Sequence, residues 1–334
     1  MVLATVYETV GSTYTKAGHR MLIAGNADYR GLVSGGCLEG DLADRARGVL
    51  ERDEPQAVTY DMRDEADDLW GLGVGCNGLI RVFLQPLTAS GEYEPFASIA
   101  RRLLSGSRAS TATIIASQSN ELPAGATLVW DGETRGGSPL EPRASDRLIP
   151  GCNAARKRSR PFLETRADGL AVLYAPLAPV PRLLVLGAGL DAVPVVNMAA
   201  ELGWLVTLAD HRPAYLEKAD FTAADGALLI DPPTLSRELE LGEFDAVIVM
   251  SHHFVTDQTY LAQLASVDLD YVGVLGPRAR RERLLSALED AGALLAPRLR
   301  GPVGIDIGAD TPESIALSLL AEIHATLAEV SGHR

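Results

Sequence analysis

The sequence is short of cysteine and has no long apolar segment. Its 334 residues contain three cysteines, and no two of them form a CxxC pair. A disulfide framework, a zinc site of the CxxC type and a thioredoxin-like centre are therefore not expected, and a reducing compartment fits best. No window offers about 18 apolar residues without a charge, and the N-terminus lacks a basic segment followed by an unbroken apolar stretch. We therefore expect a cytoplasmic protein with no membrane span.

Basic residues are also scarce. The chain carries 30 lysines and arginines against 44 aspartates and glutamates, which gives a formal net charge of −14. A general electrostatic attraction to nucleic acid or to anionic lipid is not expected of such a protein. Hydrophobic residues make up 47% of the chain and charged residues 22%, which is typical of a globular protein. The length corresponds to about two domains.

The hydrophobic pattern changes character near residue 180. Three prolines lie within residues 176–181, and we place a domain boundary there, between a domain at 1–178 and one at 179–334. After the boundary, short apolar segments without a polar face alternate with segments of helical length. This alternation is typical of an α/β fold with a Rossmann-like, doubly wound parallel sheet covered on both faces. We expect its first helix at 191–202 and its strands at 182–186, 204–210, 227–230, 244–250 and 271–275.

The first half is less regular and predicts a smaller, mixed α/β domain. Helices are expected at 38–50 and 95–104, and the stretch at 134–160 is expected to be rich in loops. The basic cluster at 156–160 is interpreted as a solvated surface. The expected strands of this domain are at 3–10, 19–23, 79–84, 112–116 and 171–173.

A glycine-bearing turn opens the second domain. Gly187 and Gly189 follow an apolar segment and precede a helix, and Asp210 ends the next expected strand, 21 residues after Gly189. In this context the glycines permit a tight turn and a close approach of the backbone to a pyrophosphate, while Asp210 could bind a ribose hydroxyl. Asp191, in the first turn of the helix, would repel a bound diphosphate. A nucleotide site and a Rossmann-shaped scaffold without that ligand are therefore both open.

A second glycine motif leads into the helix expected at 38–50. It comprises Gly35, Gly36, Cys37 and Glu39. Backbone N–H groups and the positive end of the helix dipole meet at such a position, which suits an anion and favours the thiolate form of Cys37. The alternative is that Cys37 is a small buried apolar residue where nothing larger fits.

Two further loops of the first domain are rich in glycine. Residues 71–78 hold four glycines, with Gly75 next to Cys76, and residues 11–18 form a similar loop with hydroxyls and one lysine. Such a loop lets the main chain approach either a ligand or another strand closely. The sequence predicts a close approach at these loops without distinguishing the two.

Two motifs follow later strands of the second domain. His252 comes after the strand expected at 244–250, and Gly276 and Arg278 come after the strand expected at 271–275. Both positions lie at the carboxyl edge of a doubly wound sheet, where ligands bind, and a guanidinium there suits a phosphate. The alternatives are a surface histidine with capping neighbours and a basic, solvated helix face.

The last expected helix, at 312–330, is apolar along much of its length. Thr311 is expected to cap it and Pro312 to occupy its first position. We interpret its apolar residues as core, and a homodimer contact is the alternative.

Seven segments of the chain match, in order, the motifs of a known protein family. They are GSTYTKAGHRM (11–21), GLVSGGCLEGDL (31–42), GAGLDAVPV (187–195), VTLADHRP (206–213), VMSHH (249–253), YVGVLGPRARRERL (271–284) and GPVGIDIGADTPESIALSLLAEI (301–323). With these segments the chain resembles the XdhC/CoxI family, whose members are accessory proteins of molybdenum hydroxylases such as xanthine dehydrogenase and carbon monoxide dehydrogenase.

The resemblance implies a maturation factor that binds the molybdenum cofactor. Such a chaperone protects the cofactor while a partner cysteine desulfurase or sulfurtransferase installs its terminal sulfido ligand, and it delivers the cofactor to the hydroxylase apoenzyme. Molybdopterin carries a phosphate and a sulfur-rich metal centre, which glycine loops, a helix N-terminus and thiolates suit. Under this hypothesis Cys37 and Cys76 contact the metal or its sulfurs. The alternative is an NAD(P)-dependent oxidoreductase that uses the Rossmann-like domain, with His252 or Cys37 in proton or thiol chemistry.

Overall fold

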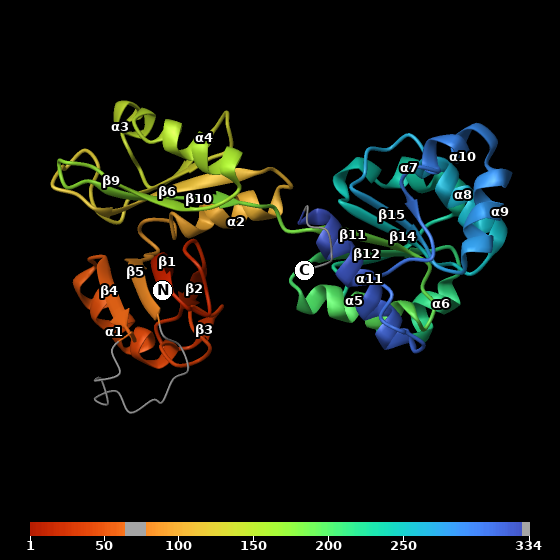
Figure 1. Ribbon diagram of the computed structural model, residues 1–334, viewed down its shortest axis with the longest axis horizontal. Coiled ribbons are helices and arrows are strands. Elements are labelled where there is room, and N and C mark those ends of the chain that lie inside the picture. Colours follow the sequence, from red (N-terminus) through yellow and green to blue (C-terminus); the bar gives the residue numbers. More distant parts are fainter. Residues whose placement is uncertain (64–77, 329–334) are drawn as a thin grey trace. The chain divides into compact units, whose positions relative to one another are not determined.

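The computed structural model describes residues 1–63 and 78–328, and the chain divides into two compact units (Figure 1). The first unit is Met1–Pro179 and the second unit is Val180–Arg334. Both combine helices with sheets, so the expected α/β class is confirmed. The first unit is the longer one, and the expectation that the N-terminal domain is the smaller is therefore wrong.

The second unit is built on a six-stranded parallel sheet with the order β13-β12-β11-β14-β15-β16. The chain moves outward from β11 in one direction and then crosses back to β14, so the strand order reverses between these two strands. The predicted doubly wound sheet is thus confirmed. Its strands are β11 (Arg182–Leu186), β12 (Leu205–Asp210), β13 (Gly226–Leu229), β14 (Ala246–Val249), β15 (Tyr271–Val274) and β16 (Leu299–Arg300).

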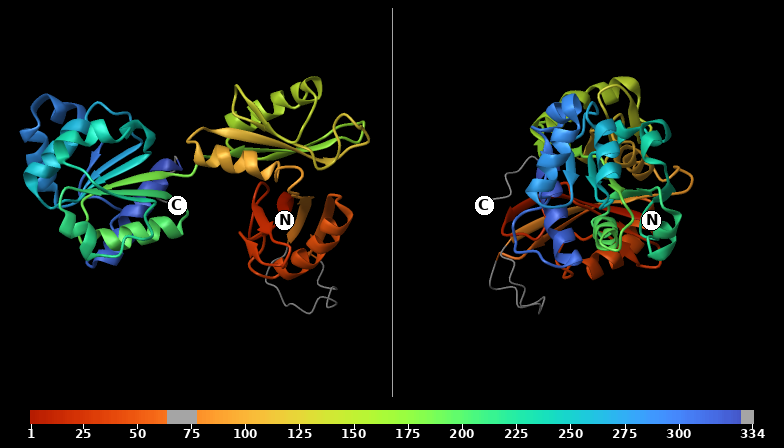
Figure 2. Two further views of the ribbon diagram at one scale, coloured as in Figure 1. Left: turned by 180° about the vertical axis from the view of Figure 1, so that it is seen from behind. Right: turned by 90° about the vertical axis from the view of Figure 1, so that its right-hand side faces the viewer.

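Helices cover both faces of this sheet (Figure 2). Alternate side chains of β11 enter different cores: Leu183 and Val185 pack with α5 and α11, whereas Leu184 and Leu186 pack with α8 and α9. A strand buried on both sides has no polar face, which explains the wholly apolar runs in the sequence. The helices are α5 (Ala192–Glu201), α6 (Pro213–Lys218), α7 (Leu235–Glu238), α8 (Phe254–Leu264), α9 (Arg278–Ala287), α10 (Glu289–Leu295) and α11 (Pro312–Leu327), with the short 3-10 helices η2 (Pro232–Thr234) and η3 (Leu241–Glu243).

Helix α11 begins as the sequence predicts. The Thr311 hydroxyl accepts a hydrogen bond from the Ser314 N–H at 3.2 Å, and Pro312 is the first helical residue. Leu319 and Ile323 are buried in the core shared with α5, so their interpretation as core residues is confirmed, whereas Leu317 is exposed and for it the interpretation is wrong. None of the described helices combines the length and the hydropathy needed to cross a membrane.

The first unit contains two five-stranded antiparallel sheets. The first sheet has the order β3-β2-β1-β5-β4 and packs against α1; the second has the order β8-β7-β6-β10-β9 and packs against α4. The strands are β1 (Val2–Gly11), β2 (Arg20–Ile23), β3 (Tyr29–Arg30), β4 (Gln56–Asp61), β5 (Gly78–Pro86), β6 (Ala109–Ala116), β7 (Thr127–Trp130), β8 (Arg135–Gly137), β9 (Phe162–Thr165) and β10 (Ala171–Leu177). The helices are α1 (Glu39–Arg52), α2 (Phe96–Leu104), α3 (Pro142–Asp146) and α4 (Ile149–Arg158).

The sequence predicts β1, β2, β5, β6 and β10 and misses the four edge strands of the two sheets together with the inner strand β7 (Thr127–Trp130). All five expected strands are present, as are α1 and α2. The strands β3 and β8 are only two and three residues long and have no buried residue, so they show no apolar alternation that a sequence pattern could detect.

The expectation of a loop-rich stretch at 134–160 is wrong, because β8, α3 and α4 lie within it. The sequence does not predict α4, because Pro150 and Gly151 near its start are typical of loops, although Pro is well tolerated in a first turn. Gly151 is required there, since a Cβ on it would lie 2.2 Å from the ring of Tyr174. The basic cluster forms the end of α4, and Arg158 and Arg160 are exposed as expected.

Candidate functional site

The predicted site residues form two groups, one in each unit. The first group surrounds the N-terminus of α1, and the second lies at the carboxyl edge of the parallel sheet. Gly75 and Cys76, which were also predicted as site residues, lie outside the described residues.

Glu39 begins α1 and holds the loop that precedes it. Its side chain is fully buried, and its carboxylate accepts hydrogen bonds from the N–H groups of Val33 and Ser34, at 3.0 and 2.8 Å, and from the Ser34 hydroxyl. The Leu38 N–H donates to it at 3.2 Å. Burial by itself would raise the pKa of Glu39, but the hydrogen bonds, those of Ser34 above all, outweigh burial and lower it. The ionised carboxylate of Glu39 therefore fixes the conformation of the loop before α1.

The loop anchored by Glu39 presents Cys37 to solvent. Gly35, Gly36 and Cys37 are exposed, and Cys37 is a free thiol. Gly36 has a φ of 105°, a conformation that side chains rarely adopt, and a Cβ on it would meet only open space. The interpretation of Cys37 as a small buried residue is therefore wrong. That description fits Cys152, where burial raises the pKa of the thiol to about 12.

The loop at 11–18 lies against the Cys37 loop. The Thr15 hydroxyl donates to the Val33 carbonyl at 2.6 Å. The ring of Tyr14 lies beside Gly35, where an added Cβ would be 3.7 Å from it, and Tyr14 is 64% exposed. An aromatic ring, open glycine backbone and a free thiol thus meet at the start of α1.

Gly78, the described end of the loop at 71–78, lies against the loop at 11–18. A Cβ on Gly78 would lie 2.5 Å from the carbonyl oxygen of Ser12, in the loop at 11–18. Gly78 is therefore a glycine because another segment of main chain passes close to it.

In the second unit, the predicted strand, turn and helix are present at the carboxyl end of β11. Gly187 has a φ of 125°, and a Cβ on it would lie 2.5 Å from the carbonyl oxygen of Met250. The turn therefore needs glycine both for its backbone conformation and for its close contact with the end of β14.

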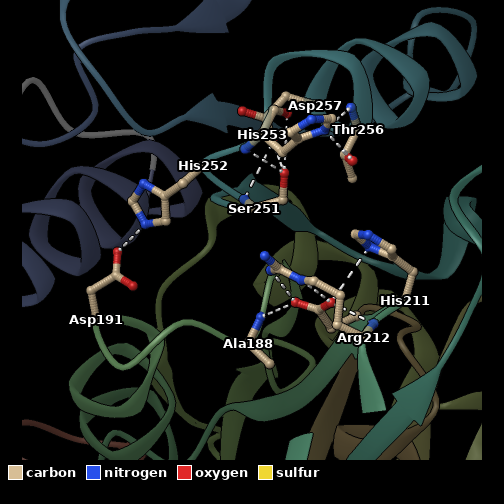
Figure 3. Close-up of polar contacts among 10 residues, drawn as sticks. Ala188, Asp191, His211, Arg212, Ser251, His252, His253, Thr256 and Asp257 are labelled. Atoms are coloured by element: carbon tan, nitrogen blue, oxygen red, sulfur yellow. Dashed lines mark hydrogen bonds and ion pairs between the residues drawn. The ribbon is translucent and has the colours of Figure 1, made fainter. Parts of the chain in front are cut away.

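Asp210 ends β12 and is fully buried. Its carboxylate accepts hydrogen bonds from the Ala188 N–H at 2.7 Å and from two nitrogens of the Arg212 guanidinium at 2.9 and 2.8 Å (Figure 3). Burial would raise the pKa of Asp210, but these bonds, with Arg212 the largest contributor, lower it. Both carboxylate oxygens accept hydrogen bonds from the protein, so Asp210 connects the glycine turn to β12. Its carboxylate does not face solvent, where a ribose would bind.

A second buried acid–base pair lies beyond the end of β14. Asp257 of α8 accepts hydrogen bonds from the Ser251 hydroxyl and, at 2.6 Å, from the Arg280 guanidinium of α9. This pair joins the loop after β14 to two helices. His253 caps α8 by accepting from the Thr256 N–H at 3.4 Å.

His252 faces the glycine turn. Its Nε2 lies 2.8 Å from a carboxylate oxygen of Asp191, the residue that precedes α5 (Figure 3). His252 has a φ of 62°, which is rare for a residue with a side chain. The hydrogen bond to Asp191 raises the pKa of His252 and Asp257 adds to this, whereas burial and Arg280 oppose it. Sequence reasoning identified His252 and Asp191 separately and missed that they meet, because 61 residues separate them.

The basic residues after β15 point in different directions. Gly276 has a φ of 126°, and the side chain of Arg280 passes 2.6 Å from where its Cβ would be. Arg278 is 80% exposed and pairs with Glu282 at 2.9 Å on the outside of α9. Two residues along a helix correspond to roughly 200° of rotation, so Arg278 and Arg280 face opposite sides. The interpretation as a solvated basic face therefore describes Arg278, whereas Arg280 belongs to the sheet edge.

The two groups offer different chemistry. The first presents an exposed thiol beside open backbone, and the second presents three acid–base pairs around a glycine turn. Within residues 1–63 and 78–328, no three His, Cys, Asp or Glu side chains gather as ligands for a metal ion.

Comparison with known proteins matches both units to one family. Residues 1–61 match the model of the XdhC and CoxI family, and residues 183–323 match that of the XdhC Rossmann domain. A Bacillus subtilis (strain 168) protein, named as a probable subunit of xanthine dehydrogenase, is 34% identical over 99% of this chain and 94% of its own. The molybdenum cofactor insertion chaperone PaoD of Escherichia coli (strain K12) is 24% identical over 96% of this chain and 82% of its own. A crystal structure from Bacillus halodurans, described as a xanthine dehydrogenase, is 30% identical, covers 99% of this chain and 92% of its own, and superposes with a TM-score of 0.77.

Proposed function

The chain belongs to the XdhC and CoxI family, and on that basis we propose that it is a chaperone that binds the molybdenum cofactor. It holds the cofactor while a cysteine desulfurase or sulfurtransferase installs the terminal sulfido ligand. It then delivers the cofactor to the apoenzyme of a molybdenum hydroxylase such as xanthine dehydrogenase. Similarity along most of the chain to a molybdenum cofactor insertion chaperone supports a role in cofactor maturation.

The exposure of Cys37 is the observation that carries the proposal. A thiolate binds a metal centre only if the metal can reach it, and Cys37 is exposed between open glycine backbone and the start of a helix. The cofactor carries a planar pterin ring, a phosphate and a sulfur-bound molybdenum. Beside Cys37, the ring of Tyr14 suits a planar ring system, and the backbone around Gly36 is open to a ligand.

Glu39 positions this site rather than contacting the cargo. Its buried carboxylate orders the loop from Val33 to Leu38 and leaves Cys37 on the outside. Cys76 is proposed as a second thiol contact on the basis of its sequence alone, because it lies outside the described residues.

The second unit gives the oxidoreductase alternative no specific support. An NAD site of the Rossmann type uses a carboxylate that can reach the ribose and a glycine turn that the diphosphate can approach. Here Asp210 is buried against Arg212 and the Ala188 N–H, and Asp191 lies at the turn. The protein is therefore proposed as an accessory protein and not as an enzyme.

The proposal is tested by purifying the protein under anaerobic, reducing conditions from a host that makes the cofactor. Molybdenum is measured by metal analysis, and the pterin is measured as its fluorescent oxidation product. We expect near-stoichiometric molybdenum and pterin with the wild type. In Cys37→Ser the Kd for the cofactor should rise about tenfold or more, which corresponds to the loss of a metal contact worth about 1.4 kcal/mol, and less molybdenum and pterin should remain after dilution and washing. The double variant Cys37→Ser, Cys76→Ser should retain less still.

Cys152→Ala is the matched control, since it removes a thiol of the same unit that is buried away from solvent. It should retain the cofactor like the wild type. Unchanged retention in the double variant would refute the assignment of the cysteines. A wild-type protein that takes up no pterin but binds NAD(H) at micromolar strength would replace the chaperone with the oxidoreductase.

A further inference from the structure

The carboxylate of Asp191 lies against the glycine turn of the second unit. A Cβ on Gly189 would lie 2.3 Å from Oδ1 of Asp191, so this oxygen rests directly against the Gly189 backbone. In a Rossmann turn the backbone around the glycines is the surface that a diphosphate approaches. Asp191 therefore occupies that surface with a negative charge.

The side chain of His252 also lies next to Gly189 and contacts Asp191. Its Cδ2 lies 3.8 Å from the Gly189 Cβ position, and its Nε2 bonds the second carboxylate oxygen of Asp191 at 2.8 Å. The left-handed backbone of His252 is unfavourable by itself, so the surrounding contacts must hold it. The pair thus links the loop after β14 to the start of α5, across the turn.

The other two carboxylates of this edge have partners of a different kind. Asp210 is held by Arg212 and Asp257 by Arg280, and both carboxylates are 1% exposed. In the Asp191–His252 pair the exposed fractions are 26% and 58%. Of the three carboxylates, that of Asp191 is therefore the one that a ligand at the glycine turn can meet.

We infer that Asp191, held by His252, is an internal competitor for the diphosphate position, so that the glycine turn of this Rossmann-like unit rejects nucleoside diphosphates and dinucleotides. Asp191 is the specificity-determining residue, and His252 is the positioning residue that keeps its carboxylate over Gly189. Removing the charge of Asp191 frees both the backbone of the turn and the imidazole of His252, and each then favours a phosphate. This specificity is independent of whether the first unit binds the molybdenum cofactor.

The test is calorimetric titration of the full chain with ADP, and with adenosine as the probe that lacks the diphosphate. We expect Asp191→Asn and Asp191→Ala to bind ADP at least about tenfold more tightly than the wild type, because a like charge close to the phosphates is removed. Adenosine binding should be the same in all three proteins. The double variant Asp191→Ala, His252→Ala should bind ADP less tightly than Asp191→Ala, because it lacks the freed imidazole.

Asp270→Asn is the matched control, because it removes an exposed carboxylate of the same unit immediately before β15, at the opposite edge of the sheet. It should leave ADP binding unchanged. Circular dichroism and the melting temperature identify variants that are folded like the wild type. The inference is overturned if both folded Asp191 variants bind ADP no better than the wild type, or if adenosine gains as much as ADP.

Discussion

At the scale of single residues, Glu39 decides the conformation of the loop that carries Cys37. Four hydrogen-bond donors from Val33, Ser34 and Leu38 converge on one buried carboxylate. Because these donors lower the pKa of Glu39, its ionised form stabilises the fold. The contribution is complete above the pKa of the unfolded state, about 4.3, and is lost as the pH falls through the lower pKa of the folded state.

We therefore predict that Glu39→Gln lowers the free energy of unfolding at pH 7 by about 1–3 kcal/mol, since an amide leaves buried N–H groups facing a donor. Below pH 4.3 the free energy of unfolding should also fall less steeply with decreasing pH than in the wild type, because one carboxylate with a lowered pKa is gone. Acid denaturation followed by circular dichroism measures this. Asp44→Asn, at an exposed position of the same helix, is the control and should change neither quantity. Equal behaviour of Glu39→Gln and the wild type would contradict this role.

At the scale of elements, α4 packs closely against β10 through a glycine. Gly151 lies in the first turn of α4, and a Cβ there would be 2.2 Å from the ring of Tyr174, which is fully buried and stacks on Phe162. We predict that Gly151→Ala destabilises the first unit by about 1–3 kcal/mol, because the ring has no room to move aside. Urea unfolding followed by tryptophan fluorescence measures this, since the Trp130 indole donates to Asn153 of α4 at 3.0 Å.

Gly40→Ala is the control for this element. Gly40 also lies in the first turn of a helix, α1, and a Cβ on it would meet nothing within 4 Å. The substitution should leave stability unchanged or raise it by up to about 1 kcal/mol, because alanine has the higher helix propensity. A loss at Gly151 no larger than that at Gly40 would show that the contact with Tyr174 is not restrictive.

At the scale of the whole molecule, the charge decides which surfaces the protein avoids. With a formal net charge of −14, it should be repelled by polyanions. We predict no binding to duplex DNA in a mobility-shift assay and no flotation with vesicles containing anionic lipid, at physiological salt. Vesicles of neutral lipid are the control and should behave the same. Binding that weakens steeply as salt is raised would reveal a local basic surface strong enough to overcome the net charge.

The sequence by itself determined the architecture of the second unit and the positions of its turns. Strands buried on both faces must be apolar throughout, so β11, β14 and β15 are visible as short apolar runs without reference to any other part of the chain. The cap at Thr311 is likewise local, because it depends on a contact three residues away, and so is the positive φ of Gly187, although the close contact of Gly187 with Met250 is not.

Only the tertiary structure decided which charged residues meet. Asp191 pairs with His252 across 61 residues and Asp257 with Arg280 across 23, and no local pattern records such partners. The structure likewise separated the cysteines, leaving Cys37 exposed and Cys152 buried, because burial depends on what packs over a residue and not on its neighbours in sequence. The short outer strands belong here too, since β3 and β8 exist only through pairing with the strand beside them.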